Sequence, residues 1–467
     1  MSAAVRKNLL WRQASLPDGL GTLLIVLAIT LSSAHAAGEV DTSFGENGLA
    51  ATTLLPDLPG VRANSAVVLP DGRIVVGGTA IVTFTESEIV LAAYLPDGTL
   101  DTSFGSDGIV RPDYPEMDDQ LASMTVTRDG NIVIVGIAEI AVADQDLLIG
   151  MFSPSGDPVE SFGEGGAVRR DVTDFRDSAR AVAAHPDGGI VLAAAFVPDE
   201  SNLLDRDFAV LKYLADGTPD PNFGVDGLVI TDFGNFEDEA TAVAVQDDGR
   251  IIVAGGAGFE RDFSDIGFRS DFGLVRYLPD GSLDPSFGDD GRVRTPVQFR
   301  SRIVDVILTE NGNIIVIGES QTELLQRVVA LAFYRADGTL DTARGDAGVL
   351  LLESFSDFPF ACGRCLLQQA DGGILVGVND VTTPESGVIA LNADGTIDRA
   401  FGVDGYGRHG TFVEQRATVI AGERIVSAGF DVRPGEGFER IALTALTGGV
   451  TAETVFFSGF EGGEAAK

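Results

Sequence analysis

The sequence predicts an all-β protein, a seven-bladed β-propeller built from four-stranded antiparallel blades. Three observations lead to this prediction. A polar turn with one aromatic anchor, seen at residues 101–108, recurs along the chain at nearly constant spacing. Four short runs rich in β-branched residues follow one another within each interval. An Asp-Gly or Asn-Gly pair, the usual turn of a β-hairpin, joins the second run to the third.

The anchor of the turn is a Phe-Gly pair. The phenylalanines are Phe44, Phe104, Phe162, Phe223, Phe287 and Phe401, and Arg344-Gly345 takes the corresponding place once. Successive anchors are 60, 58, 61, 64, 57 and 57 residues apart. A period of this length indicates a repeat architecture, so the chain holds seven copies of one unit.

Residues 223–287 show the unit most clearly. Its four runs are 228–230, 240–245, 251–255 and 272–277. No stretch combines a 3.6-residue period with caps, so we expect few helices. A β-helix is the main rival, but its repeats are usually shorter and its strands are not joined by tight hairpins. Third runs such as 251–255 are apolar on both faces, as a strand packed between two neighbouring sheets requires.

The turn and the runs resemble a known bacterial repeat. The segment DTSFG-x-DG, the run AVAVQDDGRIIVAGG and the segment DFGLVRYLPDGSLDPSFG are similar to the delta-60 repeat family, whose members are exported. The resemblance extends from Asp41 to about Ala445 and weakens at the Arg344 unit and in the seventh unit. It implies a β-propeller fold and export, and it supplies no catalytic residues.

The two ends of the chain differ from the repeats. Residues 1–36 read as a signal peptide, with a basic start, an apolar run at 23–31 and a small-x-small cleavage site at 34–36. That run is too short for a membrane span, although a signal anchor stays an alternative. We expect the repeat domain at 37–450. In the C-terminal tail at 451–467, residues 451–457 read as an extra strand that pairs with a blade edge, followed by disorder.

Charge and export limit the partners. The formal net charge is −38, which argues against nucleic acid or anionic lipid as a ligand. The sequence predicts an exported monomer, located outside the cell, on its surface or in the periplasm. Solubility is one explanation for the acidity, and attraction of cations is the other.

The chain holds two cysteines, in the order Cys362-Gly-Arg-Cys365. In an exported protein this spacing favours a structural disulfide within a loop. A zinc site needs two further ligands, and no second pair exists. A free pair and a catalytic dithiol are the alternatives.

Connection lengths separate a fixed face from a variable one. The aromatic position of the fourth run precedes the next anchor by 10 residues in every unit, whereas the span from the third run to that position varies from 17 to 26. In an up-and-down meander the fixed turns share one face and the variable loops share the other. Variable loops are where binding surfaces are usually built. The candidate ligand-binding residues are Tyr114, Asp119, Phe175, Asp177, Phe236, Asp238, Arg261, Asp265 and Phe358.

The acids among these residues have two interpretations. Clustered carboxylates can bind Ca²⁺, which takes several oxygen ligands. An aspartate near the start of a strand more often caps a turn by accepting backbone N–H groups. No EF-hand spacing is present, so the sequence favours caps; Ca²⁺ stays possible, and no metal site is identified.

Catalytic motifs are missing. The sequence contains no G-x-S-x-G, H-E-x-x-H, Walker or S-x-x-K motif. His185 and His409 lie in loops, where we expect solvated side chains. The sequence therefore favours a non-enzymatic binding or surface-scaffold protein that recognises a protein or a glycan. The alternative is an extracellular hydrolase or lyase acting on polysaccharide.

Overall fold

The structure, a computed structural model, consists of β-strands joined by turns. It describes residues 37–448 except 54–59, 84–85, 113, 115–117, 142–143, 174–176, 197–205, 235–237, 263–266, 323–325, 353–359, 380–385, 410–412 and 432–439. No helix occurs in these described residues, and hence none that crosses a membrane. Residues 35–467 form one compact unit, and the following description concerns that unit alone.

Antiparallel pairing groups the described strands into seven sets of four. Within each set, each of the two middle strands pairs with a neighbouring strand on either side. The first two sets are β2 (Gly60–Val68), β3 (Ile74–Ile81), β4 (Ser87–Tyr94) and β5 (Ile109–Val110), then β6 (Asp118–Val126), β7 (Ile132–Ala141), β8 (Asp144–Phe152) and β9 (Ala167–Arg170). The third and fourth are β10 (Asp177–Ala184), β11 (Ile190–Phe196), β12 (Asp207–Tyr213) and β13 (Leu228–Thr231), then β14 (Glu239–Val245), β15 (Ile251–Asp262), β16 (Gly267–Tyr277) and β17 (Arg292–Thr295).

The remaining three sets follow the same pattern, except that the last takes its outer strand from the start of the chain. They are β18 (Arg300–Leu308), β19 (Ile314–Gln321), β20 (Arg327–Tyr334) and β21 (Val349–Leu351), then β22 (Phe360–Gln368), β23 (Ile374–Asn379), β24 (Ser386–Leu391) and β25 (Tyr406–Arg408), and finally β26 (Val413–Ala421), β27 (Arg424–Asp431), β28 (Arg440–Thr447) and β1 (Leu49–Thr52).

Each sheet is offset by one strand from the sequence repeat. The short run after a Phe-Gly turn pairs with the last long strand of the preceding unit, as β5 does with β4 through Leu91 and Val110. The prediction that one repeat makes one sheet was therefore wrong in its boundaries. The physical reason is the length of the turn. The turn is too short to carry the chain to the neighbouring sheet, so the short run pairs with the edge strand that precedes it in the sequence.

The same offset closes the structure. In the seventh set the outer strand is β1, which pairs with β28 from Leu49 opposite Thr444 to Thr52 opposite Ile441. The predicted pairing of residues 451–457 with a blade edge stays a prediction, and at this edge the outer strand is β1. The segment 451–457 itself lies outside the described residues.

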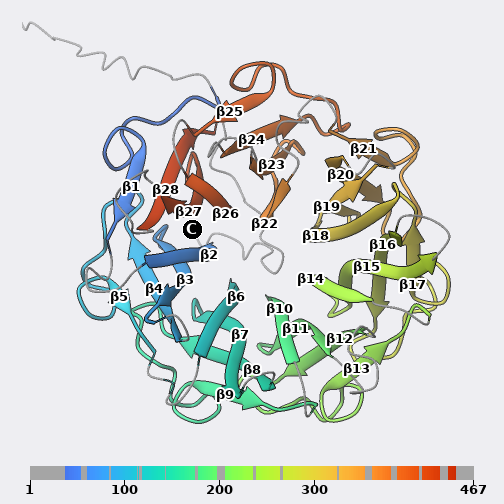
Figure 1. Ribbon diagram of the computed structural model, residues 1–467, viewed down its shortest axis with the longest axis horizontal. Coiled ribbons are helices and arrows are strands. Elements are labelled where there is room, and N and C mark those ends of the chain that lie inside the picture. The colour runs from blue at the N-terminus through green and yellow to red at the C-terminus, as the bar shows by residue number, and fades with distance from the viewer. Residues whose placement is uncertain are drawn as a thin grey trace, which may run out of the picture. The chain divides into compact units, whose positions relative to one another are not determined.

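The seven sets contact one another in chain order. The innermost strands β2, β6, β10, β14, β18, β22 and β26 each contact the next, and β26 contacts β2 (Figure 1). Single parallel bridges, Ser270 with Arg300 and Arg364 with Ala417, join two pairs of sets into eight-stranded sheets. The innermost strands therefore surround a common centre.

The apolar core lies between neighbouring sets. One cluster joins Val75 of β3 to Met124 of β6, and the other clusters likewise combine side chains of adjacent sets. The second strand of each set is apolar on both faces, and Ile74, Val75 and Val76 are fully buried. Burial of each such side chain contributes about 1.5–3 kcal/mol as an upper estimate, which a lone sheet could not gain.

The aromatic anchors are buried in the turns between sets. All six phenylalanines of the repeat are 0–2% exposed. A Cβ built on Gly98 of the next turn would lie 2.8 Å from the ring of Phe44, so only glycine fits there. At the exceptional unit, Gly395 faces Phe333 in the same way, at 3.3 Å. The ring of Phe333, which comes from β20, thus occupies the space of the missing anchor, and the Arg344 guanidinium lies 5.4 Å from its centroid.

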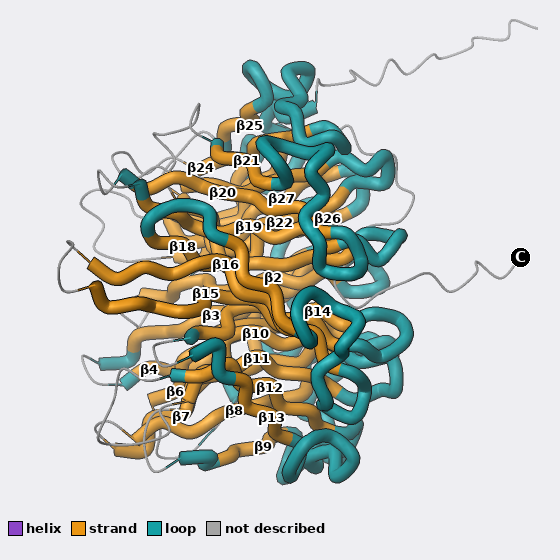
Figure 2. Tube along the Cα trace, turned by 90° about the vertical axis from the view of Figure 1, so that its right-hand side faces the viewer, coloured by secondary structure: helices purple, strands orange, loops and turns teal. Residues whose placement is uncertain are grey.

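The turns share one face, as the sequence predicted. Ion pairs join the hairpins between first and second strands to the turns between sets: Arg73 to Asp101 at 3.0 Å and Lys212 to both Asp187 and Asp220 at 2.7 and 2.9 Å. Figure 2 shows these described turns gathered at one end of the strands. We call this end the turn face, and the other, where the innermost strands begin, the loop face.

Candidate functional site: a channel between the innermost strands

A β-bulge shapes the innermost strands. In six of the seven sets the pairing with the second strand skips one residue, and in the sixth set the shift extends from Ala361 to Leu366. The skipped residues are Asn64, Ala122, Arg180, Thr241, Val304 and Arg416. A bulge bends its strand and re-aims side chains, and five of these six residues line the central cavity.

Glycines opposite the bulges make room for them. A Cβ on Gly255 would overlap the carbonyl oxygen of Glu239, and a Cβ on Gly136 that of Gln120. Glycine therefore accompanies the bulge in these sets, because a Cβ would meet the innermost strand. In the third set Ala194 stands at this place, opposite Ala179.

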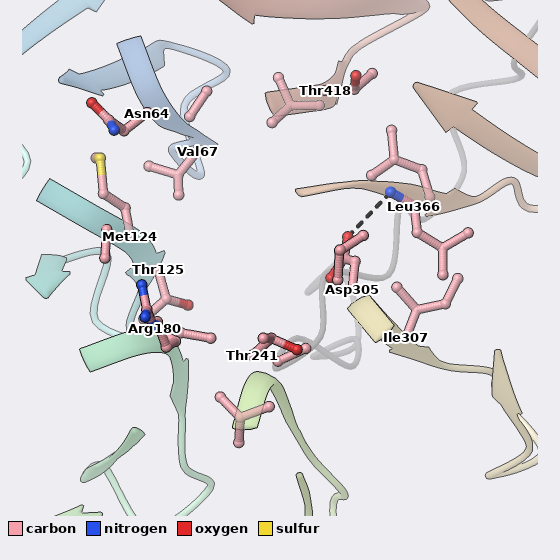
Figure 3. Close-up of a pocket in the computed structure, with 18 of the residues that line it drawn as sticks. Asn64, Val67, Met124, Thr125, Arg180, Thr241, Asp305, Ile307, Leu366 and Thr418 are labelled. Atoms are coloured by element: carbon pink, nitrogen blue, oxygen red, sulfur yellow. Dashed lines mark hydrogen bonds between the residues drawn. The ribbon is translucent and has the colours of Figure 1, made fainter. Parts of the chain in front are cut away.

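The cavity has a volume of about 550 Å³ and is lined by residues of all seven innermost strands. Figure 3 shows Asn64, Met124, Arg180, Thr241 and Thr418 around the opening. Most of the wall is aliphatic. The apolar lining includes Val67, Val68, Leu69, Met124, Val126, Val243, Val304, Ile307, Leu366, Leu367 and Val419.

The charged lining is small and mixed. Among the described residues it comprises Arg180, Glu239, Arg302 and Asp305. Arg180, Glu239 and Arg302 lie near the starts of β10, β14 and β18, hence towards the loop face. Leu69 and Pro70 follow the end of β2, hence towards the turn face. The channel is therefore charged at one end and aliphatic at the other.

The charges form a row across three sets. Arg180 Nη2 lies 2.9 Å from Glu239 Oε1, and Arg302 Nη1 lies 3.9 Å from Glu239 Oε2. Arg302 and Arg327 each approach Glu319 Oε2 at 3.8 Å. Burial raises the pKa of Glu319 although the two arginines oppose this shift. The carboxylates are 16–17% exposed and the arginines 40–50%, so the acids lie beneath and the guanidinium groups face outward.

The fourth charged residue, Asp305, holds two strands together. Its carboxylate accepts the backbone N–H of Val306 at 2.9 Å and that of Leu366 in the next set at 3.1 Å (Figure 3). Thr241 donates to the carbonyl of Ile303 at 2.6 Å, which links the fourth set to the fifth in the same manner. These polar groups fix the spacing of the channel wall.

Two of the residues predicted from sequence lie together at the loop face of the second set. Tyr114 packs against the apolar cluster between the first two sets, and burial raises the pKa of its phenol. Asp119 is 3% exposed, and its Oδ1 has no hydrogen-bond partner among the described residues. Burial, and then the nearby Asp118 and Glu88 carboxylates, raise the pKa of Asp119 to about 7.

Two other predicted acids are caps. Asp177 accepts the backbone N–H groups of Val172 and Thr173 at 2.6 and 3.0 Å. Asp238 accepts those of Phe233 and Gly258 at 2.7 and 2.6 Å. Burial raises the pKa of both carboxyls, to about 6 for Asp238. Both oxygens of Asp238 are occupied by the backbone, which is the structural role that the sequence favoured.

Asp238 also belongs to a group of carboxylates. One oxygen each of Asp207, Asp232 and Asp238 lies within 4.8 Å of the others, the spacing that a metal ion needs. Asp232 in turn accepts the N–H of Gly234 at 2.5 Å. Among the described residues, this group corresponds best to the calcium site that the sequence left possible.

The other predicted residues are not brought into a described site. Phe175, Phe236, Asp265 and Phe358 lie outside the described residues. Arg261 is in β15, where its backbone pairs with Phe268, and its side chain is not described.

Cysteine and histidine residues are more buried than loop positions suggest. Cys365 is fully buried and disulfide-bonded, while the side chain of Cys362, the other cysteine of the chain, is not described. The Cys362–Cys365 pairing stays a prediction. The expectation of solvated histidines was wrong: His185 and His409 are 6% and 5% exposed, and burial lowers the pKa of His409 to about 3.

Sequence reasoning missed the charged row. Arg180 takes a bulge position where small or apolar residues such as Ala122 and Val304 stand in other sets. The counterparts of Arg302 include Arg62 and Glu239, so a charge there is no departure from the repeat. The charge of Arg180 at its bulge position was the signal available in the sequence. The bulge turns Arg180 towards the channel, and the glycine that accompanies the bulge in other sets is replaced by Ala194 in this one.

Four stretches match the family described as "Domain of unknown function (DUF5122) beta-propeller": residues 69–104, 185–223, 246–287 and 369–401. These stretches are thus similar to repeats of a β-propeller family, and together they cover less than half of the chain. No curated protein is a significant sequence match.

Solved structures match this chain at low identity and with TM-scores below 0.5. The polysaccharide lyase Uly1 is 11% identical, with a TM-score of 0.48, over 82% of this chain and 90% of that one. Hydrazine synthase of Kuenenia stuttgartiensis is also 11% identical, with a TM-score of 0.47, over 85% of this chain and 98% of that one. A subtype N10 neuraminidase-like protein is 12% identical, with a TM-score of 0.38, over 74% and 96%.

Proposed function

We propose that the protein is an exported, non-enzymatic, seven-bladed β-propeller of the delta-60 repeat type. It binds a protein or glycan partner at the loop-face end of its central channel. The observation that carries the proposal is the cavity of about 550 Å³, to which all seven innermost strands contribute and whose charged end faces the loops. A concave site with aliphatic walls and a few placed polar groups is the usual form of a ligand site.

Pairing and contact support the proposed number of blades. Seven sets of four strands occur among the described residues, and β26 contacts β2 as every other innermost strand contacts its successor. The two eight-stranded sheets are each joined by one bridge, so we count each as two blades.

Export rests on the first 36 residues and on the resemblance to exported repeats. We propose a monomer located outside the cell, on its surface or in the periplasm. The test is direct: mass spectrometry of the protein from culture medium and cell fractions should give a mature N-terminus after Ala36. A full-length N-terminus in the cytosol would contradict it.

The enzymatic alternative has one observation in its favour, since the carboxylates of Glu239 and Asp305 both line the cavity. Paired carboxylates are the usual machinery of glycoside hydrolysis. Here, however, Glu239 is paired with Arg180 and Asp305 accepts two backbone N–H groups. Incubation with neutral and acidic polysaccharides, followed by reducing-end and unsaturated-product assays, decides this. Release that is lost in Glu239→Gln would establish the enzyme.

We propose that the group formed by Asp207, Asp232 and Asp238 binds no calcium, although the spacing of its oxygens would suit the ion. Because the backbone already occupies both oxygens of Asp238, we expect the melting temperature to be the same in 2 mM CaCl₂ and in chelator, within about 1 °C. A rise of several degrees with calcium, absent in Asp232→Asn, would show instead that the group binds the ion.

The binding proposal is tested by blocking the channel. Ala122 is a bulge residue that lines the cavity, and Ala215 is exposed on the turn face. Ligands are first identified on protein and glycan arrays with the purified chain. We then expect Ala122→Trp to weaken binding about tenfold or more and Ala215→Trp to leave it unchanged. If Ala215→Trp weakened binding and Ala122→Trp did not, the binding site would lie on the turn face.

A further inference from the structure

We propose that Arg180 and Arg302 form a carboxylate-binding site in the channel, and that its ligand is an acidic peptide segment with aliphatic side chains. This inference rests on the proposed binding function and names its ligand class. It is argued from the two arginines, the acid between them and the wall beneath.

The two guanidinium groups are held close together by one carboxylate. Arg180 contacts one oxygen of Glu239 and Arg302 contacts the other. Glu239 is 16% exposed and belongs to an innermost strand, so it is a fixed counter-ion rather than a mobile surface acid. Arginines positioned in this way before a ligand arrives lose little side-chain entropy when they bind it.

Donors remain available for a ligand. The contacts of Arg302 with Glu239 and Glu319 are 3.9 and 3.8 Å, too long for hydrogen bonds. Arg180 makes one short contact, at 2.9 Å. A guanidinium group has five N–H donors, and its planar fork matches a carboxylate. With side chains 40% and 49% exposed, both arginines can reach a ligand in the channel.

The row carries more positive than negative charge. Among the described ion pairs of the row, Arg180, Arg206, Arg302 and Arg327 surround Glu239 and Glu319, in a protein whose formal net charge is −38. A local excess of guanidinium groups over carboxylates attracts anions. Recognition of an anion gives these positions a use.

The wall favours a peptide over a sugar. Most of the described lining is aliphatic, with Ile307 and Leu366 on one side of the channel and Met124 across from them (Figure 3). Sugars pack their C–H faces on aromatic rings, and the described lining residues include none. Leucine or valine side chains beside an aspartate or glutamate would fill this space and leave the carboxylate at the arginines.

The experiment measures binding of three probes to the full chain by fluorescence anisotropy. The first is a labelled peptide of alternating leucine and glutamate, the second its leucine–glutamine counterpart, and the third a labelled oligogalacturonate. We expect saturable binding of the glutamate peptide, about tenfold weaker binding of the glutamine peptide, and weak binding of the uronate.

Substitutions assign the effect to the arginines. Arg302→Gln and Arg180→Gln should each weaken the glutamate peptide about tenfold without changing affinity for the glutamine peptide. Arg111→Gln is the matched control, since Arg111 pairs with Glu88 outside the described cavity lining, and it should have no effect. Circular dichroism melts of each variant show whether it is folded.

The outcomes are distinct. Arginine-dependent binding of the uronate in preference to the peptide would overturn the peptide assignment and leave the channel as the site. Peptide binding that Ala122→Trp blocks but Arg302→Gln and Arg180→Gln do not affect would overturn the arginine site alone. Binding unaffected by Ala122→Trp would overturn the proposed function as well.

Discussion

Arg424 donates a hydrogen bond to Asp41 at 2.7 Å across a separation of 383 residues. The same guanidinium group donates to Ser43 at 3.0 Å and to the carbonyl of Pro96 at 3.2 Å. Asp41 precedes β1, and Arg424 begins β27 of the same set. One side chain therefore joins the beginning and the end of the repeat domain, in the place that Arg73 and Asp101 occupy within the chain.

Arg424→Ala should lower the free energy of unfolding by about 1–2 kcal/mol, because Asp41 would lose its charged partner while 11% exposed. A urea denaturation curve, monitored by far-ultraviolet circular dichroism, measures the change in the free energy of unfolding. Arg399→Ala is the control: Arg399 and Asp404 are 72% and 80% exposed, and their pair at 3.6 Å should contribute less than about 0.5 kcal/mol. Equal losses in the two variants would contradict the role of Arg424.

The substituted anchor makes a coupled prediction. Phe333 fills the space of the missing phenylalanine, so Phe333→Ala should cost about 3–5 kcal/mol. Arg344→Phe alone should also destabilise, by about 1–3 kcal/mol, because two rings would compete for one space. In the double variant the new ring can occupy the vacated space, and we expect much of the loss to be recovered. A double-mutant cycle from thermal melts measures the coupling, and additive losses would refute the exchange.

Ala347 occupies a strained backbone position. Its φ is +51°, where the equivalent turns have Asn47, Asp107, Asp226 or Asp290 at +50° to +55°. Asparagine tolerates this region better than alanine. Ala347→Asn should therefore raise the free energy of unfolding by about 0.5–1 kcal/mol, whereas the reverse change, Asn47→Ala, should lower it by a similar amount. No difference between the two directions in chemical denaturation would contradict the argument.

Asp119 makes stability depend on pH. Its folded-state pKa is raised to about 7, above the unfolded value near 4, so the native state retains a proton that the unfolded state has lost. Stability should therefore fall as pH rises from about 4 to 7 and stay lower above 7. Asp119→Asn removes the charge and should raise stability at pH 8 by on the order of 2–4 kcal/mol.

The measurement is the melting temperature of both forms from pH 4 to 8. The two curves should be close at pH 4 and diverge towards pH 8. Asp289→Asn, which alters an exposed carboxylate, serves as the control and should follow the parent curve. A parallel offset at every pH would assign the effect of Asp119→Asn to packing instead of titration.

The fold was largely predictable from sequence because its signals are local and repeated. Phe104 with the Gly105 turn, and the Asp71-Gly72 hairpin, fix where strands begin and end in every unit. The sheet edge with which a short strand pairs depends on distances in space. The residues of β5 do not show that its partner is β4. For that reason the offset of the sheets and the closing role of β1 were missed.

The site was less predictable, for a physical reason. Asp177 and Asp238 were chosen as acids in variable loops, and both turned out to satisfy backbone N–H groups. Arg180 reaches the channel because a bulge shifts it, between Ala179 opposite Ala194 and Ala181 opposite Ala193. A bulge of this kind can be recognised once the register of the two paired strands is known.

The pairing of β1 with β28 has a consequence for biosynthesis. Residues 49–52 are made near the beginning of translation, and their partners at 441–444 near its end. Until then the first strand has no edge to join, and the newest sheet has an open one. Completion of the domain is thus a late, single event. Before it, the first strand of one molecule can pair with the open edge of a second copy, and the two molecules then exchange this strand.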